Sequence, residues 1–394
     1  MKNTTLVPYS FQLVGGGVEV TIKIRERKDH FVITIYKEMR QQLEILEGDI
    51  LILNVNNTEI IRPVRKDAAV SLPKNLLQGK KNRDKVSLII KKVINQKSCL
   101  KRPSIGTLQN KIDIKHFISK KTSRGYPLYI IPRNNETFSV WFPIGGGVRH
   151  VTINNFVDVD EISEFLGFYF GDGSKSKGLQ SIRLTNCEPS ILQHCLSILE
   201  NIGISRKMCK VQVIYATDSM VTTEIKRRCI KFWSNTLQLK QDQIVSVNKS
   251  YNVRETKKYG SARVCIDRSV LVEVIIHGLL QGVLYRICNP KDEIDYQMIR
   301  AFMRGLLAAE GFPEFNIYGS LVKVGIAFNP HSSELQIYQK LLTNLGINYG
   351  KVSGNALYIY GSNNMKKFKD IDAFKLHTTR NKKFLRGYMK NSRL

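Results

Sequence analysis

The sequence feature that most restricts the fold is the nine-residue run FLGFYFGDG at residues 165–173. Five of its first six residues are large and apolar, so a helix formed by this run has no polar face and must be buried. Gly167 and Gly171 lie one helical turn apart and carry no side chain, so another backbone can approach them closely. The run therefore predicts a central buried helix with a tightly packed partner.

A second run of the same kind, FMRGLLAAEG, occupies residues 302–311. Gly305 and Ala309 repeat the pair of small residues, and Glu310 repeats the acidic residue Asp172. The two acidic residues are 310 − 172 = 138 positions apart. A repeat over that distance indicates a duplication across two halves of the chain.

If the small faces of the two helices pack on each other, Asp172 and Glu310 lie side by side at the helix ends. The helix dipole disfavours negative charge there, and two neighbouring carboxylates repel each other. A divalent metal ion between them would relieve both effects. We also expect Gly173 and Gly311 to end the helices in the left-handed conformation, which glycine adopts easily.

With these two motifs the chain resembles the LAGLIDADG homing endonucleases in their single-chain, two-motif form, from about residue 150 to the C-terminus. The residues that lead into the motifs, 157–161 and 299–305, fit the same pattern. The resemblance implies an α+β fold with two pseudo-symmetric αββαββα half-domains, residues 157–290 and 291–394, that form a saddle over the DNA major groove. The interface between the central helices would be formed by Gly167, Gly171, Gly305 and Ala309.

The resemblance also implies the chemistry of the site. Asp172 and Glu310 would be catalytic and would bind Mg²⁺, together with the backbone carbonyls of Gly171 and Ala309 and with phosphate oxygens. The family more often has Asp at the second position, but both carboxylates are hard oxygen ligands. A basic residue near each metal site is a further family feature, which Lys375 and His377 match only loosely.

The charge of the chain indicates its partner. Lys and Arg number 61 against 33 acidic residues, which gives a net charge of +28, and hydrophobic residues make up 42%, too many for a disordered basic tail. Such an excess on a folded chain favours nucleic acid as the partner. In the resembled family the strands turn one face to DNA, and the candidate contacts here are Lys175, Lys177, Arg183, Lys210, Arg254, Lys257, Lys258, Arg263, Lys323 and Lys351.

The N-terminal part, residues 1–95, has its own repeat. Residues 28–55 read as strand, short helix, turn and strand, and a weaker copy follows at 66–90, with residues 48–49 aligned to 83–84. This order resembles the AbrB/MazE-like swapped-hairpin domains, which bind DNA and close one barrel from two halves. The alternative is a β-hairpin packing module that binds nothing.

The remaining segments are less distinctive. Residues 96–112 are polar and basic and are expected to form a linker, followed by a β-rich connector at 113–156. Residues 244–253 and 262–266 are expected to pair as neighbouring strands, and the chain ends in a basic tail after residue 375.

The sequence thus favours a metal-dependent, site-specific double-strand DNA endonuclease that acts as a monomer with internal pseudo-twofold symmetry. The alternatives are a non-cleaving DNA-binding transcription regulator on the same scaffold and an RNA-splicing maturase. Seven cysteines without metal-ligand spacing, a polar N-terminus without a signal peptide and the lack of a long apolar run predict a cytoplasmic, nucleoid-associated protein without a membrane partner.

Overall fold

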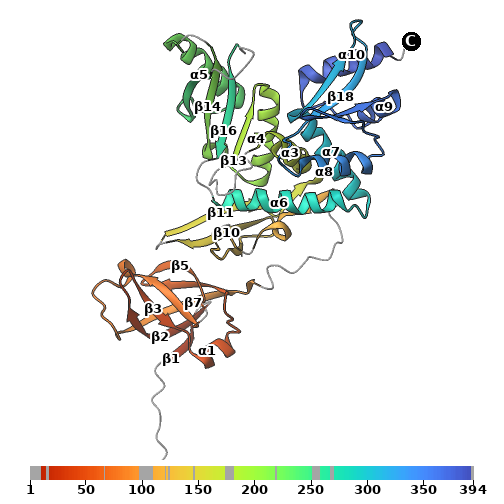
Figure 1. Cartoon of the computed structure of the whole chain (residues 1–394). Helices are drawn as coiled ribbons and strands as arrows, with labels where there is room; N and C mark the ends of the chain where they lie inside the picture. Colours follow the sequence, from red (N-terminus) through yellow and green to blue (C-terminus); the bar gives the residue numbers. More distant parts are fainter. Residues whose placement is uncertain are drawn as a thin grey trace, which may run out of the picture. The chain divides into compact units, whose positions relative to one another are not determined.

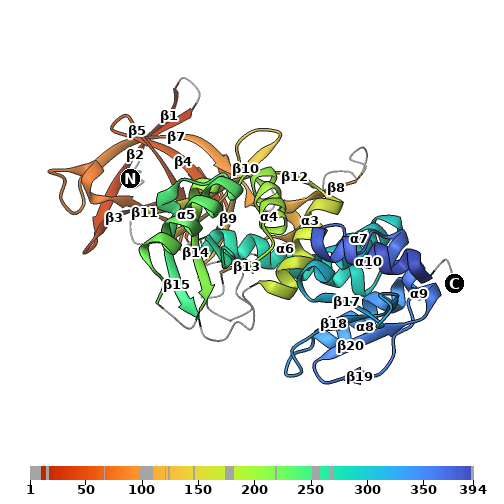
Figure 2. The ribbon, with the colours of Figure 1, turned by 90° about the horizontal axis from the view of Figure 1, so that it is seen from above.

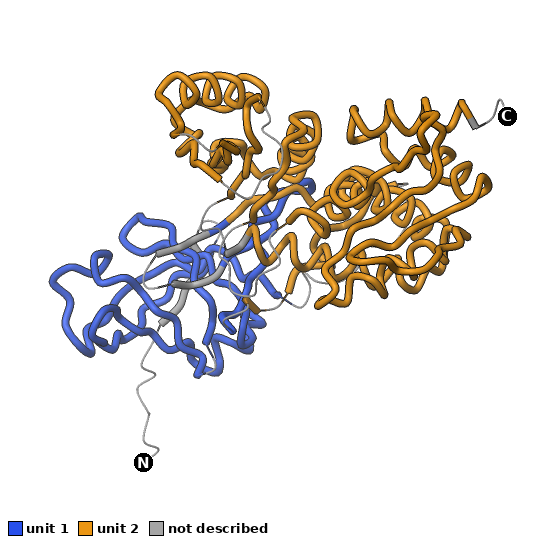
Figure 3. Tube along the Cα trace, turned by 45° about the horizontal axis from the view of Figure 1, so that its top comes forward, with its two compact units in different colours: residues 1–106, 125–150 blue, residues 107–124, 151–394 orange. Residues whose placement is uncertain are grey.

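The protein has a mixed α+β structure that divides into two compact units (Figures 1 and 3). Unit 1 comprises residues 1–106 and 125–150, and unit 2 comprises residues 107–124 and 151–394. The computed structural model describes residues 10–14, 17–65, 67–96, 110–119, 121–122, 125–144, 147–173, 182–217, 220–250, 258–266 and 270–391.

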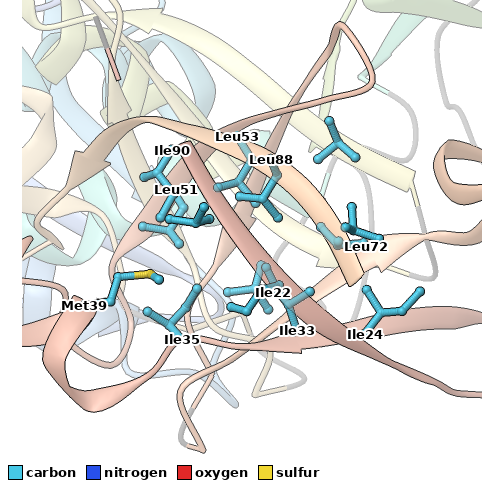
Figure 4. Packing of buried hydrophobic residues seen from close by; sticks show 14 of the residues in the cluster. Ile22, Ile24, Ile33, Ile35, Met39, Leu51, Leu53, Leu72, Leu88 and Ile90 are labelled. Carbon is cyan, nitrogen blue, oxygen red and sulfur yellow. The ribbon is translucent and has the colours of Figure 1, made fainter. Parts of the chain in front are cut away.

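Unit 1 is built around one antiparallel sheet in the order β5-β4-β7-β2-β3-β6, with β1 added beside β2. Alternate side chains of β2 point inward, so that Val20, Ile22 and Ile24 are fully buried. Figure 4 shows Ile22 and Ile24 packed with Leu51 and Leu88 from other strands. The elements are β1 (Ser10–Val14), β2 (Gly17–Glu26), β3 (His30–Thr34), α1 (Lys37–Gln42), β4 (Ile50–Val55), β5 (Thr58–Pro63), β6 (Ala69–Pro73), the 3₁₀-helix η1 (Lys74–Leu77) and β7 (Lys85–Ile94).

The sequence repeat of unit 1 corresponds to a repeat in its structure. Strand β3 pairs with β6 and β4 pairs with β7, so equivalent strands of the two copies are neighbours. Two matching turns precede β4 and β7: Asp49 accepts a hydrogen bond from the Leu46 N–H, and Asp84 accepts one from the Lys81 N–H, both at 2.8 Å. The residue before each aspartate has a positive φ, 86° in the first turn and 73° in the second.

The segment expected to be a separate connector at 113–156 is divided between the two units. Strands β9 (Tyr129–Pro132) and β10 (Thr137–Ile144) form a small sheet with β11 (Gly147–Asn154). The Gln96 side chain joins this sheet to β7 through two 2.9 Å hydrogen bonds with the backbone of Ile130. Residues 125–150 belong to unit 1 because their apolar side chains share a core with β4 and β7, formed by Ile50, Ile94, Tyr129, Ile131 and Trp141.

The first half of unit 2 holds a four-stranded sheet in the order β13-β16-β14-β15. Its elements are α3 (Val159–Asp172), β13 (Ile182–Asn186), α4 (Pro189–Ile202), β14 (Cys209–Ala216), α5 (Thr223–Leu237), β15 (Ile244–Ser250), β16 (Ser261–Ile266) and α6 (Val270–Cys288). The expected pairing of residues 244–253 with 262–266 is wrong. Strand β15 instead runs parallel to β14, because α5 connects them as a crossover.

The second half has a fully antiparallel sheet in the order β17-β18-β20-β19 (Figure 2). Its elements are α7 (Glu293–Ala309), β17 (Gly311–Phe315), β18 (Leu321–Ala327), α8 (Glu334–Asn344), β19 (Val352–Ser353), β20 (Ala356–Tyr360), α9 (Ser362–Asp370) and α10 (Thr378–Asn391). The expected basic tail is therefore largely helix α10, which packs on β17 and β18 and places Gly387 against the Phe315 ring.

The two halves share part of their strand order. The series β13-β16-β14 matches β18-β20-β19, and the bridge between Gly173 and Leu184 matches the pair Gly311 and Ile326. Helix α5 and strand β15 have no counterpart in the second half. The described second half follows the expected αββαββα order through α9 and adds α10, whereas the first half carries an α5–β15 addition.

Helices α3 and α7 pack with their backbones in close contact. A Cβ atom at Gly167 would lie 2.1 Å from the Phe302 carbonyl oxygen, and one at Gly305 would lie 1.9 Å from the Glu164 carbonyl oxygen. A separation of this size is possible only without a side chain. Each helix has an aspartate cap at its N-terminus, Asp158 for α3 and Asp292 for α7.

The expectation of left-handed glycines at the ends of these helices is wrong. Gly173 is extended, with φ −80° and ψ 161°, and Gly311 begins strand β17 without a positive φ. Both positions need glycine for space instead. A Cβ at Gly173 would lie 2.1 Å from the Tyr169 carbonyl oxygen, and one at Gly311 would lie 2.5 Å from the Leu307 side chain.

Helix α6 covers one side of the helix pair and contacts both α3 and α7. The short 3₁₀-helix η2 (Ile114–Phe117) packs on α6, where a Cβ at Gly278 would lie 1.9 Å from the Phe117 carbonyl oxygen. Before η2, β8 (Lys111–Asp113) pairs with β12 (Phe156–Asp158), so residues 110–119 belong to unit 2. Within the described ranges, none of the helices combines the length and apolar character that crossing a bilayer requires.

The close helix contact predicts a strong effect of one added methyl group. Gly305→Ala should lower the free energy of unfolding of unit 2 by about 3 kcal/mol, because its Cβ meets backbone that cannot rotate away. Urea unfolding monitored by circular dichroism measures this. Gly354→Ala, where no atom lies within 4 Å of the added Cβ but φ is +57°, is the control and should cost about 1 kcal/mol. Equal costs for the two variants would contradict the account.

Candidate active site and nucleic-acid interface

The two acidic residues of the motifs lie at ends of α3 and α7 that touch each other. Asp172 is the last residue of α3, and Glu310 caps the C-terminus of α7. A Cβ at Gly171 would lie 2.5 Å from the Ala309 Cβ and 3.7 Å from Glu310 Oε1. Both carboxylates are only partly buried, so a ligand in solution can reach them.

Asn186 orients the first carboxylate. Its Nδ2 donates a 3.0 Å hydrogen bond to Asp172 Oδ2, while its own Oδ1 accepts one from the Glu188 N–H at 2.8 Å. The amide is therefore held from both ends, at the junction of β13 and α4. Sequence reasoning missed Asn186, since nothing local distinguishes it from an ordinary residue before a proline-initiated helix.

Arg380 neutralises the other helix end. Its Nη1 donates to three successive carbonyls at the C-terminus of α7, those of Leu307, Ala308 and Ala309, at 3.2, 2.9 and 3.2 Å. A cation at this position opposes the negative end of the helix dipole. Burial lowers the pKa of Arg380, and the charges of Asp172 and Glu310 act in the opposite direction. The sequence placed Arg380 only in a basic tail.

The residues present fit a divalent cation in part. Asp172 and Glu310 provide carboxylate oxygens, the ligand type that Mg²⁺ prefers. The Ala309 carbonyl, expected to be a metal ligand, already accepts a hydrogen bond from Arg380, whereas the Gly171 carbonyl has no such guanidinium contact among the described hydrogen bonds. Over the described part of the chain, no cluster of three or more His, Cys, Asp or Glu side chains forms a protein-only metal site.

Lys375 belongs to a network of ion pairs away from the acidic tips, the ends of α3 and α7 that carry Asp172 and Glu310. Glu164, on α3 two turns before Asp172, is 3% exposed and has three basic partners. These are Arg304 Nε at 2.6 Å, Lys375 Nζ at 2.7 Å and His194 Nε2 at 3.0 Å. Lys375 thus joins the two halves rather than reaching Asp172 or Glu310.

Burial alone would raise the pKa of Glu164, but the hydrogen bonds from His194 and Lys375 and the charge of Arg304 outweigh it. The pKa is lowered from the ordinary 4.5 to about 2.

His377, the other loosely matched residue, is buried beside Glu188, with Nδ1 3.9 Å from Oε2. Because the Glu188 N–H donates to Asn186, this contact places His377 beside the junction of β13 and α4.

The sheet of the first half brings several predicted DNA contacts to one face. Arg183 and Lys210 stand on either side of Cys265 in the strand register, and Arg263 stands between Thr185 and Gln212. These side chains alternate with buried ones such as Val264, so they share the open face of the sheet. Lys258, just before β16, is exposed.

The corresponding residues of the second half are arranged differently. Lys323 Nζ forms a 3.0 Å ion pair with Glu314 and lies 3.8 Å from the centre of the Tyr358 ring. Lys351, just before β19, is exposed. The other predicted contacts lie outside the described residues: Lys175, Lys177, Arg254 and Lys257.

No protein-family model matches the sequence, and no curated protein matches it either. Among solved structures, the chain is similar to the crystal structure of the N-terminal LAGLIDADG domain of DUF199/WhiA. The TM-score is 0.30 and the sequence identity 15%, over 54% of this chain and 82% of that chain.

The Glu164 network predicts a specific acid sensitivity. Because the folded-state pKa is lowered, the ionised carboxylate stabilises the fold above about pH 4.5, and this contribution is lost as the pH falls toward 2. Its size is about 3 kcal/mol. Glu164→Gln should lower the free energy of unfolding by about that amount at pH 7 and flatten its decline in acid. Urea unfolding at pH 7, 5, 4 and 3 measures this, with the exposed Glu224→Gln as control. An unchanged acid profile in Glu164→Gln would refute the assignment.

Proposed function

We propose that the protein is a site-specific double-strand DNA endonuclease of the LAGLIDADG homing type, which hydrolyses phosphodiester bonds with the help of Mg²⁺. The observation that carries the proposal is the pair of partly exposed carboxylates, one from each half, at the touching ends of α3 and α7. Two carboxylates this close repel each other, and a divalent cation between them would offset that repulsion. The same cation would attract a DNA phosphate, which the carboxylates alone repel.

The charge and the sheets support nucleic acid as the ligand. The chain carries a net charge of +28. Arg183, Lys210 and Arg263 project from the same open sheet face as Gln212 and Thr185. Arginine, lysine, glutamine and threonine are side chains that contact phosphates and base edges in the major groove.

Asn186, Arg380 and the metal ion have different roles at the acidic tips. Asn186 donates a hydrogen bond to the Asp172 carboxylate and so fixes the direction of that side chain. Arg380 covers the carbonyls at the end of α7, so Glu310 is left to face the ligand without the full helix dipole behind it. Mg²⁺, when bound, polarises a phosphate oxygen and lowers the pKa of a water molecule, which makes that water a nucleophile at neutral pH.

Both halves of the site lie in one chain, so we propose that the protein acts as a monomer, in the cytoplasm. Unit 1 would add DNA affinity or regulation. Its two matching strand–turn–strand copies and its basic residues are consistent with a second DNA-binding module.

A non-cleaving DNA-binding regulator on the same scaffold is the second candidate. The observation that favours it is Arg380, which already supplies a fixed cation to the end of α7 and bonds the carbonyl expected to bind metal. A built-in guanidinium reduces the need for a metal ion at this end. The two candidates differ in the fate of the DNA, and both require DNA binding.

Incubation with a randomised plasmid library and Mg²⁺ tests the proposal. The protein should cut members that contain its site, and EDTA should stop cutting. Asp172→Asn and Glu310→Gln should each reduce the cleavage rate by at least about 10²-fold with little change in DNA affinity, because each removes an anionic ligand without changing size. The exposed Asp242→Asn is the matched control. Tight binding without nicks, unaffected by these variants, would establish the regulator instead.

A further inference from the structure

The open face of the second sheet carries aromatic rings where the first carries mainly polar side chains. In the register of β17, β18 and β20, Phe312 stands opposite Gly325, which stands opposite Tyr358. Tyr360 stands opposite Lys323 in the same register. Because alternate residues share a face, the three rings and Lys323 lie on one side of the sheet.

Two glycines give these rings their support. A Cβ at Gly325 would lie 2.3 Å from the Phe312 ring, and one at Gly350 would lie 3.0 Å from the Tyr360 ring. Each ring therefore rests against backbone on one side. Tyr360 remains 47% exposed, and the Lys323 ammonium group lies 5.9 Å from the centre of its ring. The Tyr358 ring is nearly perpendicular to Phe312, with centroids 6.1 Å apart and an interplanar angle of 89°.

The charged residues of this face suit bases better than phosphates. Lys323 lies over the Tyr358 ring and is paired with Glu314, so its ammonium group is already partly neutralised. The Glu314 carboxylate repels phosphate, but it can accept hydrogen bonds from the amino groups of bases. The first sheet differs, because its open face holds Arg183, Lys210 and Arg263.

An intact duplex offers little to such a surface. Paired bases show only their edges in the grooves, and their faces are covered by neighbouring base pairs. Aromatic side chains on a sheet stack on bases only where these are unpaired and unstacked. The geometry of the rings therefore points to bases that are already unpaired, or become so on binding.

We propose that the aromatic face formed by Phe312, Tyr358 and Tyr360 binds unpaired bases of DNA. The ligand has a polyanionic backbone, in keeping with the 16 basic and 8 acidic residues of segment 291–394, a net charge of +8. The inference rests on the proposed function, in that the open sheet faces contact nucleic acid. It adds that the second half engages single-stranded or locally opened segments, whereas the first half contacts paired ones.

Fluorescence anisotropy with three labelled probes tests the inference: a 30-nucleotide DNA strand, the RNA strand of the same sequence, and the corresponding DNA duplex. Tyr360→Leu and Phe312→Leu in the full-length protein should weaken binding to the single strands roughly 5- to 100-fold, the range for the loss of one stacked base. Their affinity for the duplex should change less than about 2-fold. A loss of affinity on the RNA strand without a loss on the DNA strand would overturn the assignment to DNA.

Matched variants separate stacking from folding. Tyr360→Phe keeps the ring and should bind as the unchanged protein does. Tyr285→Leu removes a ring that is 66% exposed on α6, outside this face, and should likewise leave binding unchanged. Losses that are equal on duplex and single strands, or absent from Tyr360→Leu, would overturn the inference while leaving DNA binding intact. Failure of the unchanged protein to bind any of the three probes would refute the proposed function itself.

Discussion

The close approach of α3 and α7 is the contact on which the rest of unit 2 depends. At Gly167 and Gly305, each helix lies directly on the backbone of the other, and most side chains around the contact are fully buried. The approach fixes the ends of the two helices beside each other and sets a sheet after each of them. It also has an electrostatic consequence, because two helix C-termini, each with a partial negative charge, end next to two carboxylates.

The chain balances its acidic groups in two ways along the same helix pair. Glu164, in the buried part, has three basic partners within 3.0 Å and holds the two halves together. At the partly exposed end, Asp172 accepts a hydrogen bond from the Asn186 amide, and beside Glu310 the Arg380 guanidinium donates to the α7 carbonyls. The first arrangement suits stability, since a buried carboxylate must be paired. The second leaves carboxylate oxygens accessible, as binding of a cation and a phosphate requires.

Local patterns predicted much of the secondary structure. The strand patterns within 28–55 and the apolar runs at 165–171 and 302–309 correspond to β3, β4, α3 and α7, because each segment buries its own apolar side chains. The strand at β15 was expected, but its parallel pairing with β14 was missed, as was the helix α10, because both depend on what these segments pack against. Gly173 and Gly311 were assigned to the right places for the wrong reason, since space rather than a positive φ requires glycine there.

The candidate site was predictable only in part. The acidic residues could be found because their motifs repeat, but the partners could not. Asn186 contacts Asp172 from β13, and Arg380 contacts the end of α7 from α10. Lys375 was near the expected position in the chain, yet its ammonium group is held by Glu164. Side-chain direction, unlike motif spacing, depends on tertiary contacts that a single sequence does not reveal.

We propose that Asp172 and Glu310, at the two acidic tips, hold a cation jointly. Anomalous diffraction tests this most directly. Crystals of the protein with its DNA and Mn²⁺, an oxygen-seeking ion that suits the same carboxylate ligands, should show an anomalous peak in contact with Asp172 and Glu310. A map with the DNA bound and no peak at the tips, or with the two carboxylates turned away from the phosphates, would contradict the account.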